Sequence, residues 1–153
     1  MRHIFLTFFY SGLLPKAPGT WGTIAGAIVG ILILKFLTLE TLVLATILLT
    51  LISIKEIDKE EKESGLHDAS WIVIDEVAGI WLALAMSGAT MIQIVLSVIF
   101  FRVFDIWKPS VIGRIDREVK GGLGVMGDDL LAGIFAGIAS AGVYQAMGYF
   151  GLI

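Results

Sequence analysis

The chain has 153 residues, of which 57% are hydrophobic and only 16% are charged, and its mean hydropathy is +0.90. Because soluble domains carry about 25% charged residues, this composition indicates an integral membrane protein, and the length indicates a single domain, 1–153. The net charge of −3 argues against a nucleic-acid partner. The absence of cysteine excludes disulfides, thiolate metal sites and a cysteine nucleophile.

The N-terminal half contains two apolar stretches that could approach the roughly 20 residues a helix needs to cross a bilayer. A shorter apolar stretch, 4–9, precedes them and predicts a short N-terminal helix rather than a signal peptide. The first long stretch, 17–34, carries no charge, and Thr20 is the expected N-cap of a helix opening at Trp21. The second, 41–54, has only fourteen residues, so it either spans fully, or is tilted or re-entrant.

The C-terminal half predicts three more spans. The mixed-charge run before them, 55–68, is interpreted as a solvated helical extension and loop. The third and fourth spans are 71–87 and 90–107, the polar and glycine-rich residues 108–127 form a loop, and the fifth span is 128–150. We therefore expect an all-α fold: a multi-helix polytopic membrane bundle of about five spans plus the short N-terminal helix.

Basic residues concentrate on one side of this predicted bundle. The N-terminus and the loops 55–70 and 108–127 share a side that holds nine lysines and arginines, whereas the opposite loops hold only Lys35. Cytoplasmic loops are enriched in basic residues, so we assign this side to the cytoplasm. Three tryptophans fall at the same boundary, where indole rings prefer to lie: Trp21, Trp71 and Trp107.

Two glycine patterns call for different interpretations. Small residues recur every four positions in the first and last spans, which favours close helix packing in lipid, at Gly22, Gly26 and Gly30 and at Gly133, Gly137 and Ala141. The G-x-G-x-x-G within 122–127 does not indicate dinucleotide binding, because it follows a polar segment and no acid that could bind a ribose lies about 20 residues later.

Charged residues within or beside the spans mark the candidate site, because ionisable groups inside a membrane usually serve a function. The predicted threading gathers them at the cytoplasmic face, although they are distant in sequence: Asp75, Glu76, Arg102, Asp105, Lys108, Asp128 and Asp129, with Lys16 and Thr20 nearby. Each group has a structural alternative. Arg102 and Asp105 could neutralise each other, and the two aspartates at 128–129 could cap a helix. His67 is interpreted as a loop or capping residue.

Five carboxylates in this set exceed the positive charge beside them, which favours a bound cation over purely structural pairing. Mg²⁺ prefers carboxylate and water oxygens, often with a substrate phosphate completing its shell. Arg102, Lys108 and Lys16 supply cations that suit phosphate oxygens. We infer metal-dependent chemistry on a phosphate at the boundary between lipid and cytoplasm.

Four segments, in this order and spacing, resemble phosphatidylglycerophosphatase A: PGTWGT (18–23), HDASWIVIDEVAG (67–79), FRVFDIWKP (101–109) and GGLGVMGDDLLAG (121–133). The resemblance covers nearly the whole chain. It implies a Mg²⁺-dependent lipid phosphatase of the bacterial inner membrane, multi-pass, with its active site at the cytoplasmic face. Its substrate would be phosphatidylglycerophosphate and its product phosphatidylglycerol, on the way to cardiolipin.

On this resemblance we assign roles to the charged residues. Asp75, Glu76, Asp128 and Asp129 hold one or two Mg²⁺ ions, and Asp105 is a fifth ligand. Arg102 and Lys108 bind the phosphomonoester, with Lys16 and the Thr20 loop assisting. The catalytic residues are Asp75, Glu76, Asp105 and Asp129, and a metal-activated water attacks phosphorus in line. An aspartyl-phosphate formed on Asp105 is the alternative route.

Two rival functions come from other classes. A divalent-cation transporter or binding protein of the membrane would have acids distributed across the bilayer depth, whereas this sequence clusters them at one face. A purely structural membrane subunit would leave the surplus of acids unexplained.

Overall fold

The computed structural model describes the whole chain, 1–153, and contains helices and no strands, which confirms the all-α prediction. The short N-terminal helix is also present, as α1. The elements follow in the order α1 (Arg2–Leu6), η1 (Ser11–Leu13, a 3₁₀ turn), α2 (Pro18–Phe36), α3 (Leu39–Ser64), α4 (Ile74–Ser87), α5 (Met91–Trp107), α6 (Val111–Glu118) and α7 (Gly122–Tyr149).

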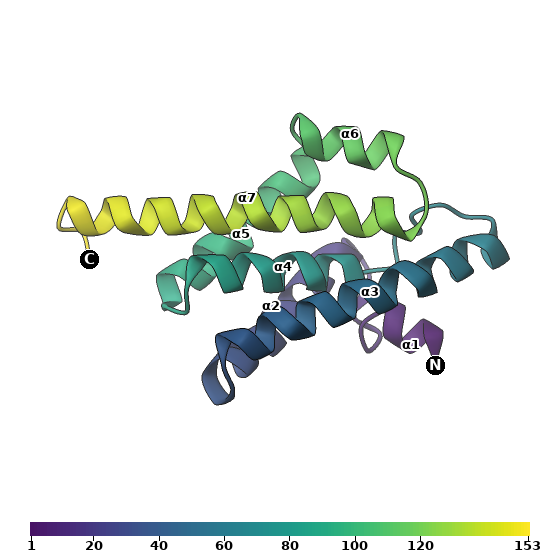
Figure 1. The fold of residues 1–153 in the computed structure, drawn as a ribbon, viewed down its shortest axis with the longest axis horizontal. Helices are drawn as coiled ribbons and strands as arrows, with labels where there is room; N and C mark the ends of the chain where they lie inside the picture. The colour runs from purple at the N-terminus through teal and green to yellow at the C-terminus, as the bar shows by residue number, and fades with distance from the viewer.

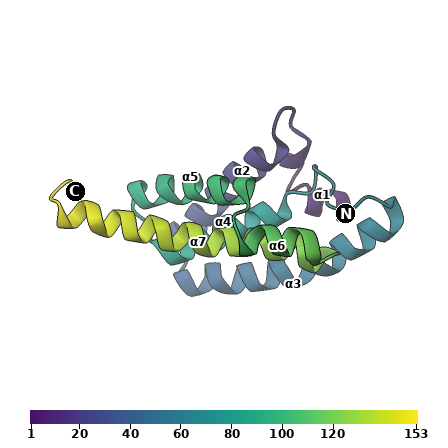
Figure 2. The same cartoon turned by 90° about the horizontal axis from the view of Figure 1, so that it is seen from above.

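Helix α4 lies at the centre of the bundle. It packs against α2, α3, α5 and α7. Seen from above, it lies between α3 on one side and α2 and α5 on the other (Figure 2), and α7 runs alongside it (Figure 1). Ten of its fourteen residues are buried, which fits a helix that is apolar on nearly every face. The residues at the start of α4 are therefore held inside the protein.

The outer faces of the bundle are apolar. Large side chains on α2, α3, α5 and α7 are more than half exposed, among them Ile28, Leu44, Leu48, Val95 and Ile138. Exposed apolar surface of this extent marks contact with lipid or with another protein. Two helices, α2 and α7, are long and apolar enough to cross a membrane, and the full set of five spans remains a prediction.

Two predicted helix starts were wrong. Helix α2 begins at Pro18 rather than at Trp21, so Thr20 lies inside the helix and is not its N-cap. Proline suits the first helical position because its φ is already helical and its missing N–H is not needed there. Helix α4 begins at Ile74 rather than at 71, which places Asp75 and Glu76 in its first turn.

The prediction of a loop over 108–127 was also wrong. These residues contain α6 and the first turns of α7, so Asp128 and Asp129 lie in the second turn of α7 and cap nothing. The glycines here serve close packing: a Cβ on Gly122 would lie 2.2 Å from the Ile54 carbonyl oxygen, and one on Gly124 would lie 2.0 Å from that of Val119. Tertiary contacts therefore outweigh the low helix propensity of glycine.

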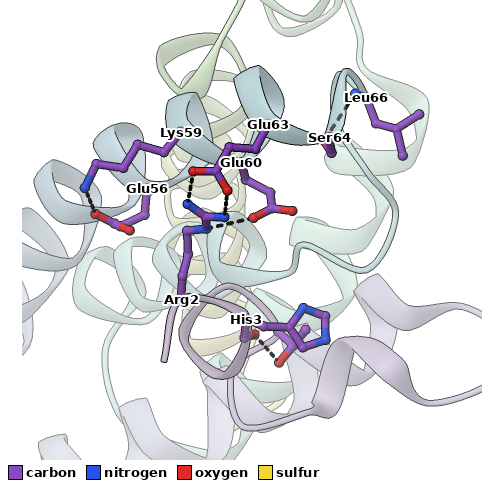
Figure 3. Close-up of polar contacts among 9 residues, drawn as sticks. Arg2, His3, Glu56, Lys59, Glu60, Glu63, Ser64 and Leu66 are labelled. Carbon is purple, nitrogen blue, oxygen red and sulfur yellow. Dashed lines mark hydrogen bonds and ion pairs between the residues drawn. The ribbon is translucent and has the colours of Figure 1, made fainter.

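Helix α3 runs without a break through the second predicted span and through most of the charged run, which confirms the helical extension. The acids of this extension do not simply face solvent. They bind three neighbouring segments: Glu60 and Glu63 bind Arg2 of α1 (Figure 3), Glu61 binds His67, and Asp58 accepts a hydrogen bond from the Gly122 backbone N–H. The extension thus ties α1, the 65–73 loop and the start of α7 together.

The glycine spacing in α2 does serve packing, as predicted. Gly22, Gly26 and Gly30 lie against α4 and the residues before it, and a Cβ on Gly26 would lie 3.0 Å from the Val77 Cα. The indole N–H of Trp81 donates a hydrogen bond of 2.8 Å to the Gly26 carbonyl oxygen. Helix α2 therefore lies directly on α4, and its N-terminus is fixed beside the first turn of α4.

Candidate active site

A polar cavity of about 330 Å³ lies where the N-termini of α2 and α4 meet the C-terminus of α5 and the second turn of α7. The 65–73 loop closes another side of it. Eight charged side chains line the cavity: Asp68, Asp75, Glu76, Arg102, Asp105, Lys108, Asp128 and Asp129. Seven of these eight were predicted as site residues, so the fold brings together groups that are up to 54 positions apart in sequence, from 75 to 129.

Three carboxylates form the centre of this cavity. Asp75, Glu76 and Asp129 each offer an oxygen, and these oxygens all lie within 4.8 Å of one another. Asp75 and Asp129 are 7% and 3% exposed, so water cannot replace a missing partner freely. The close contact between α4 and α7 brings these acids together, since both helices carry glycine one turn further along.

These carboxylates fit a divalent cation. Three carboxylate oxygens are buried and have no hydrogen-bond partner: Oδ1 of Asp75, Oε2 of Glu76 and Oδ1 of Asp128. Buried carboxylates without partners are unfavourable unless a proton or a cation compensates their charge. Carboxylate oxygens are the ligands that hard divalent cations take in proteins. The chemistry of the donor set therefore agrees with a resident metal ion.

Arg102 lies opposite the carboxylates on the last turns of α5. Its Nη1 hydrogen-bonds to Asp105, as the i, i+3 spacing allows, and lies 3.4 Å from Oγ1 of Thr23. The guanidinium is not fully occupied by these contacts, because its Nε is buried and has no partner. Arg102 thus keeps donor capacity for an anion in the cavity while Asp105 holds it in place.

Lys108 caps the C-terminus of α5 in the left-handed conformation, with φ of 45°. Its Nζ lies 2.5 Å from Oδ2 of Asp128 in α7 and 2.5 Å from Oδ1 of Asp116 in α6. Partial burial opposes the charge, but the two carboxylates outweigh that effect and raise the pKa of the Lys108 ammonium above its ordinary value. The ammonium therefore remains charged at the cavity wall.

The cavity lining does not include Lys16 or Thr20. Lys16 is exposed, with φ of 59°, and Thr20 is half-buried within α2. The neighbouring residues of the same segment line the cavity instead: Ala17, Pro18 and Gly19. A Cβ on Gly19 would lie 2.2 Å from Oε1 of Glu76, so this segment reaches the carboxylates through its backbone and not through the predicted side chains.

Two lining residues, Asp68 and Ser70, were missed by the sequence analysis. Both belong to the 65–73 loop, outside the predicted spans, where polar residues are common and do not indicate a site. The only available signal was their place beside His67 in the segment 67–79. His67 does not line the cavity, and its Nδ1 lies 2.6 Å from Oε1 of Glu61, which agrees with the loop role predicted for it.

The arrangement is suited to an anion that bears several negative charges and to the cation that binds it. Acids lie at the cavity centre, and two permanent cations, Arg102 and Lys108, lie on its wall. A phosphate group matches both kinds of partner, because arginine and lysine bind its oxygens and a divalent cation bridges it to carboxylates. The cavity can therefore hold a phosphomonoester at the end of an otherwise apolar bundle.

Comparison with known proteins agrees with this chemistry. Residues 4–144 match the phosphatidylglycerophosphatase A family. The chain is 38% identical over 135 residues to phosphatidylglycerophosphatase A of Haemophilus influenzae, covering 88% of this chain and 83% of that protein. It is 35% identical over 148 residues to phosphatidylglycerophosphatase A of Escherichia coli, covering 96% and 83%.

A third relative carries a different name. A protein of Bacteroides thetaiotaomicron, provisionally named phosphatidylinositol-3-phosphatase, is 35% identical over 142 residues, covering 88% of each chain. No solved structure matches the chain. Since the family match spans residues 4–144 and two relatives of that name are similar over most of their length, the chain belongs to the phosphatidylglycerophosphatase A family of enzymes.

Proposed function

We propose that this enzyme hydrolyses the terminal phosphomonoester of phosphatidylglycerophosphate, releasing phosphatidylglycerol and inorganic phosphate in the synthesis of phosphatidylglycerol and cardiolipin. The observation that carries the proposal is the cluster of Asp75, Glu76 and Asp129, whose oxygens lie within 4.8 Å of one another. Unpartnered carboxylate oxygens in this cluster lie in the same cavity as two cationic side chains. The names of the relatives supply the lipid substrate.

Each group has a role in the proposed reaction. Arg102 and Lys108 bind the phosphate oxygens, and Asp105 orients Arg102. Asp75, Glu76 and Asp129 would hold Mg²⁺, with Asp105 and Asp128 as further candidate ligands. When bound, the cation would supply charge neutralisation to the transferring phosphoryl group. Water adds to phosphorus and gives up a proton, the bond between phosphorus and the glycerol oxygen breaks, and that oxygen takes up a proton, which leaves the alcohol and inorganic phosphate.

The proposed location is the bacterial inner membrane, with the cavity at the cytoplasmic face. The apolar outer faces of α2, α3, α5 and α7 would contact the acyl chains of membrane lipids, including those of the substrate. All the charged cavity residues lie at one end of these helices, beside the basic loops, which supports a cytoplasmic site by the positive-inside rule. The lipid would then present its head group to the cavity without leaving the bilayer.

The test is phosphate release by the purified protein from phosphatidylglycerophosphate in mixed micelles, with Mg²⁺ or with EDTA. We expect EDTA to abolish release and Asp129→Asn to lower kcat by at least about 100-fold, since such effects are typical when a group that stabilises the transition state is removed. Glu118→Gln, an exposed change on α6, is the matched control. Full activity of Asp129→Asn would refute the site.

The same assay separates the competing substrates and functions. Phosphatidylinositol 3-phosphate is the second substrate to include, because the Bacteroides relative carries that name. A higher kcat/KM on the inositol lipid would replace the proposed substrate. Reconstituted vesicles loaded with a Mg²⁺ indicator test the rival transporter function. Ion flux without phosphate release would favour the transporter.

A further inference from the structure

The ammonium of Lys108 is held by two carboxylates from two different helices. Asp128 belongs to the cavity and its side chain is 6% exposed, whereas Asp116 is on α6, has a side chain 34% exposed and does not line the cavity. Asp116 therefore touches the cavity only through Lys108. Asp116 is not among the residues predicted for the site, and the proposed reaction assigns it no role.

The backbone around Lys108 brings α6 within reach of the Lys108 side chain. Lys108 and Ser110 have φ of 45° and 48°, and the turn they form returns the chain into α6, which packs against α7. Gly113 makes that return possible, because a Cβ there would lie 2.5 Å from the Lys108 carbonyl oxygen. Asp116 lies one helical turn beyond Gly113, on the same face of α6, and so reaches the Lys108 side chain.

Two carboxylates share the ammonium in a way that leaves capacity for a third partner. A lysine ammonium has three N–H donors, and Asp116 and Asp128 take two of them. The lysine side chain is also long and flexible, so its ammonium group moves toward its strongest hydrogen-bond partner. Without Asp116, the only carboxylate that the ammonium contacts would be Asp128, whose other oxygen, Oδ1, is buried and unpartnered.

We propose that Asp116 is a positioning residue that holds the Lys108 ammonium at the cavity wall, where its third donor meets a phosphate oxygen of the substrate. This inference rests on the proposed function for the identity of the phosphate. Asp116 prevents the Lys108 ammonium from pairing with Asp128 alone and keeps the phosphate-binding position formed before substrate arrives. Such preorganisation improves binding because the side chain is already ordered.

The test compares Asp116→Asn, Asp116→Glu and the matched control Glu118→Gln, which changes an acid on the same helix. Asp116→Asn should raise KM for the phospholipid by about tenfold, the size of one charge-assisted hydrogen bond, while kcat changes less than about twofold. Asp116→Glu should recover most of the affinity. A merely structural role would instead lower the thermal midpoint and kcat together and leave KM unchanged, and that pattern overturns the proposal.

A double-mutant cycle tests whether Asp116 acts through Lys108. In a Lys108→Met background, Asp116→Asn should have no further effect on KM, because the group it positions has been removed. An effect of equal size in both backgrounds would contradict the proposal, since Asp116 would then act on the site independently of Lys108.

Binding of inorganic phosphate, measured by calorimetry, separates this inference from the proposed function because it needs no turnover. Asp116→Asn should weaken phosphate binding by about tenfold relative to the wild type and to Glu118→Gln. If the wild type binds phosphate in this Asp116-dependent way but does not hydrolyse the lipid, only the proposed function fails. If it hydrolyses the lipid and Asp116→Asn alters neither KM nor phosphate binding, only the inference fails. A wild type with neither activity overturns both.

Discussion

Gly79 of α4 and Gly133 of α7 are in contact: a Cβ added to Gly133 would lie 2.3 Å from the Gly79 carbonyl oxygen. Each glycine lies four residues, about one helical turn, after an acid of the central cluster, Asp75 in α4 and Asp129 in α7. This close contact between the two helices therefore lies one turn away from the carboxylates. The packing of small residues in the bundle sets the distance between the acids.

The first prediction concerns this contact. Gly133→Ala should destabilise the protein by about 2 kcal/mol or more, because the new methyl group meets backbone that cannot move aside. Gly142→Ala, on the same helix, is the matched control: its Cβ would enter open space, so the change should stabilise by about 0.5–1 kcal/mol. Thermal unfolding in detergent measures both. Equal effects of the two substitutions on stability would show that a side chain at position 133 does not hinder the close approach of α4 and α7.

Gly19 provides a second prediction, directed at the cation and not at stability. A Cβ on Gly19 would lie 2.2 Å from Oε1 of Glu76 and 3.3 Å from Nη1 of Arg102. Since these atoms end flexible side chains, Gly19→Ala should leave the thermal midpoint nearly unchanged but move the Glu76 carboxylate. We expect about a tenfold rise in the Mg²⁺ concentration for half-maximal activity, as is common for changes beside metal ligands.

Gly148→Ala is the control for Gly19→Ala, because a Cβ at position 148 meets nothing within 4 Å. An unchanged Mg²⁺ requirement in Gly19→Ala, together with normal stability, would mean that Glu76 does not hold the cation.

The sequence predicted the cavity better than it predicted the helices that form it. Asp75, Glu76, Arg102 and Asp105 could be found because charge within an apolar stretch is conspicuous. Asp68 and Asp116 could not be found in this way, because they lie in polar segments where an acid is ordinary, and only tertiary contacts give them their place.

The predicted helix boundaries were wrong because they, too, depend on tertiary contacts. The glycines of 121–127 predicted a loop by propensity, yet Gly122 and Gly124 are helical because their missing side chains admit the carbonyl oxygens of Ile54 and Val119. Propensity is a local quantity, whereas the need for close packing comes from residues far away in the chain. Lys16 and Thr20 were predicted near the site only because they lead into the first span. The residues between them, 17–19, line the cavity instead.

A third prediction tests how the α3 extension supports the site. Oδ1 of Asp58 accepts a hydrogen bond of 2.7 Å from the Gly122 N–H, at the start of the helix that carries Asp129. Asp58→Ala should destabilise the protein by about 1 kcal/mol, the usual effect of losing an acceptor at a helix N-terminus. Hydrogen exchange should accelerate at the first amides of α7.

Lys62→Ala, an exposed change on the same extension, should alter neither the stability nor the exchange, and so controls for Asp58→Ala. Unchanged exchange at 122–125 in Asp58→Ala would show that the α3 extension does not fix the start of α7.

The last prediction concerns α1, which Arg2 holds against the α3 extension. Arg2 donates hydrogen bonds to Glu60 at 2.7 Å and to Oε1 of Glu63 at 3.0 Å (Figure 3). The Arg2 hydrogen bonds and charge hold the pKa of Glu63 below its ordinary value of 4.5. A lowered pKa means that this contribution is fully present above pH 4.5 and is lost as the pH falls through the folded-state pKa.

Hydrogen exchange of residues 2–6 should therefore accelerate below pH 4.5 beyond the intrinsic pH effect, and also in 1 M salt, which screens the pair. Arg2→Ala should lose this protection at every pH and salt concentration, and Lys62→Ala, an exposed change on the α3 extension, should behave like the wild type. If exchange in the wild type shows no salt dependence and no pH dependence beyond the intrinsic effect, apolar contacts, and not Arg2, hold α1.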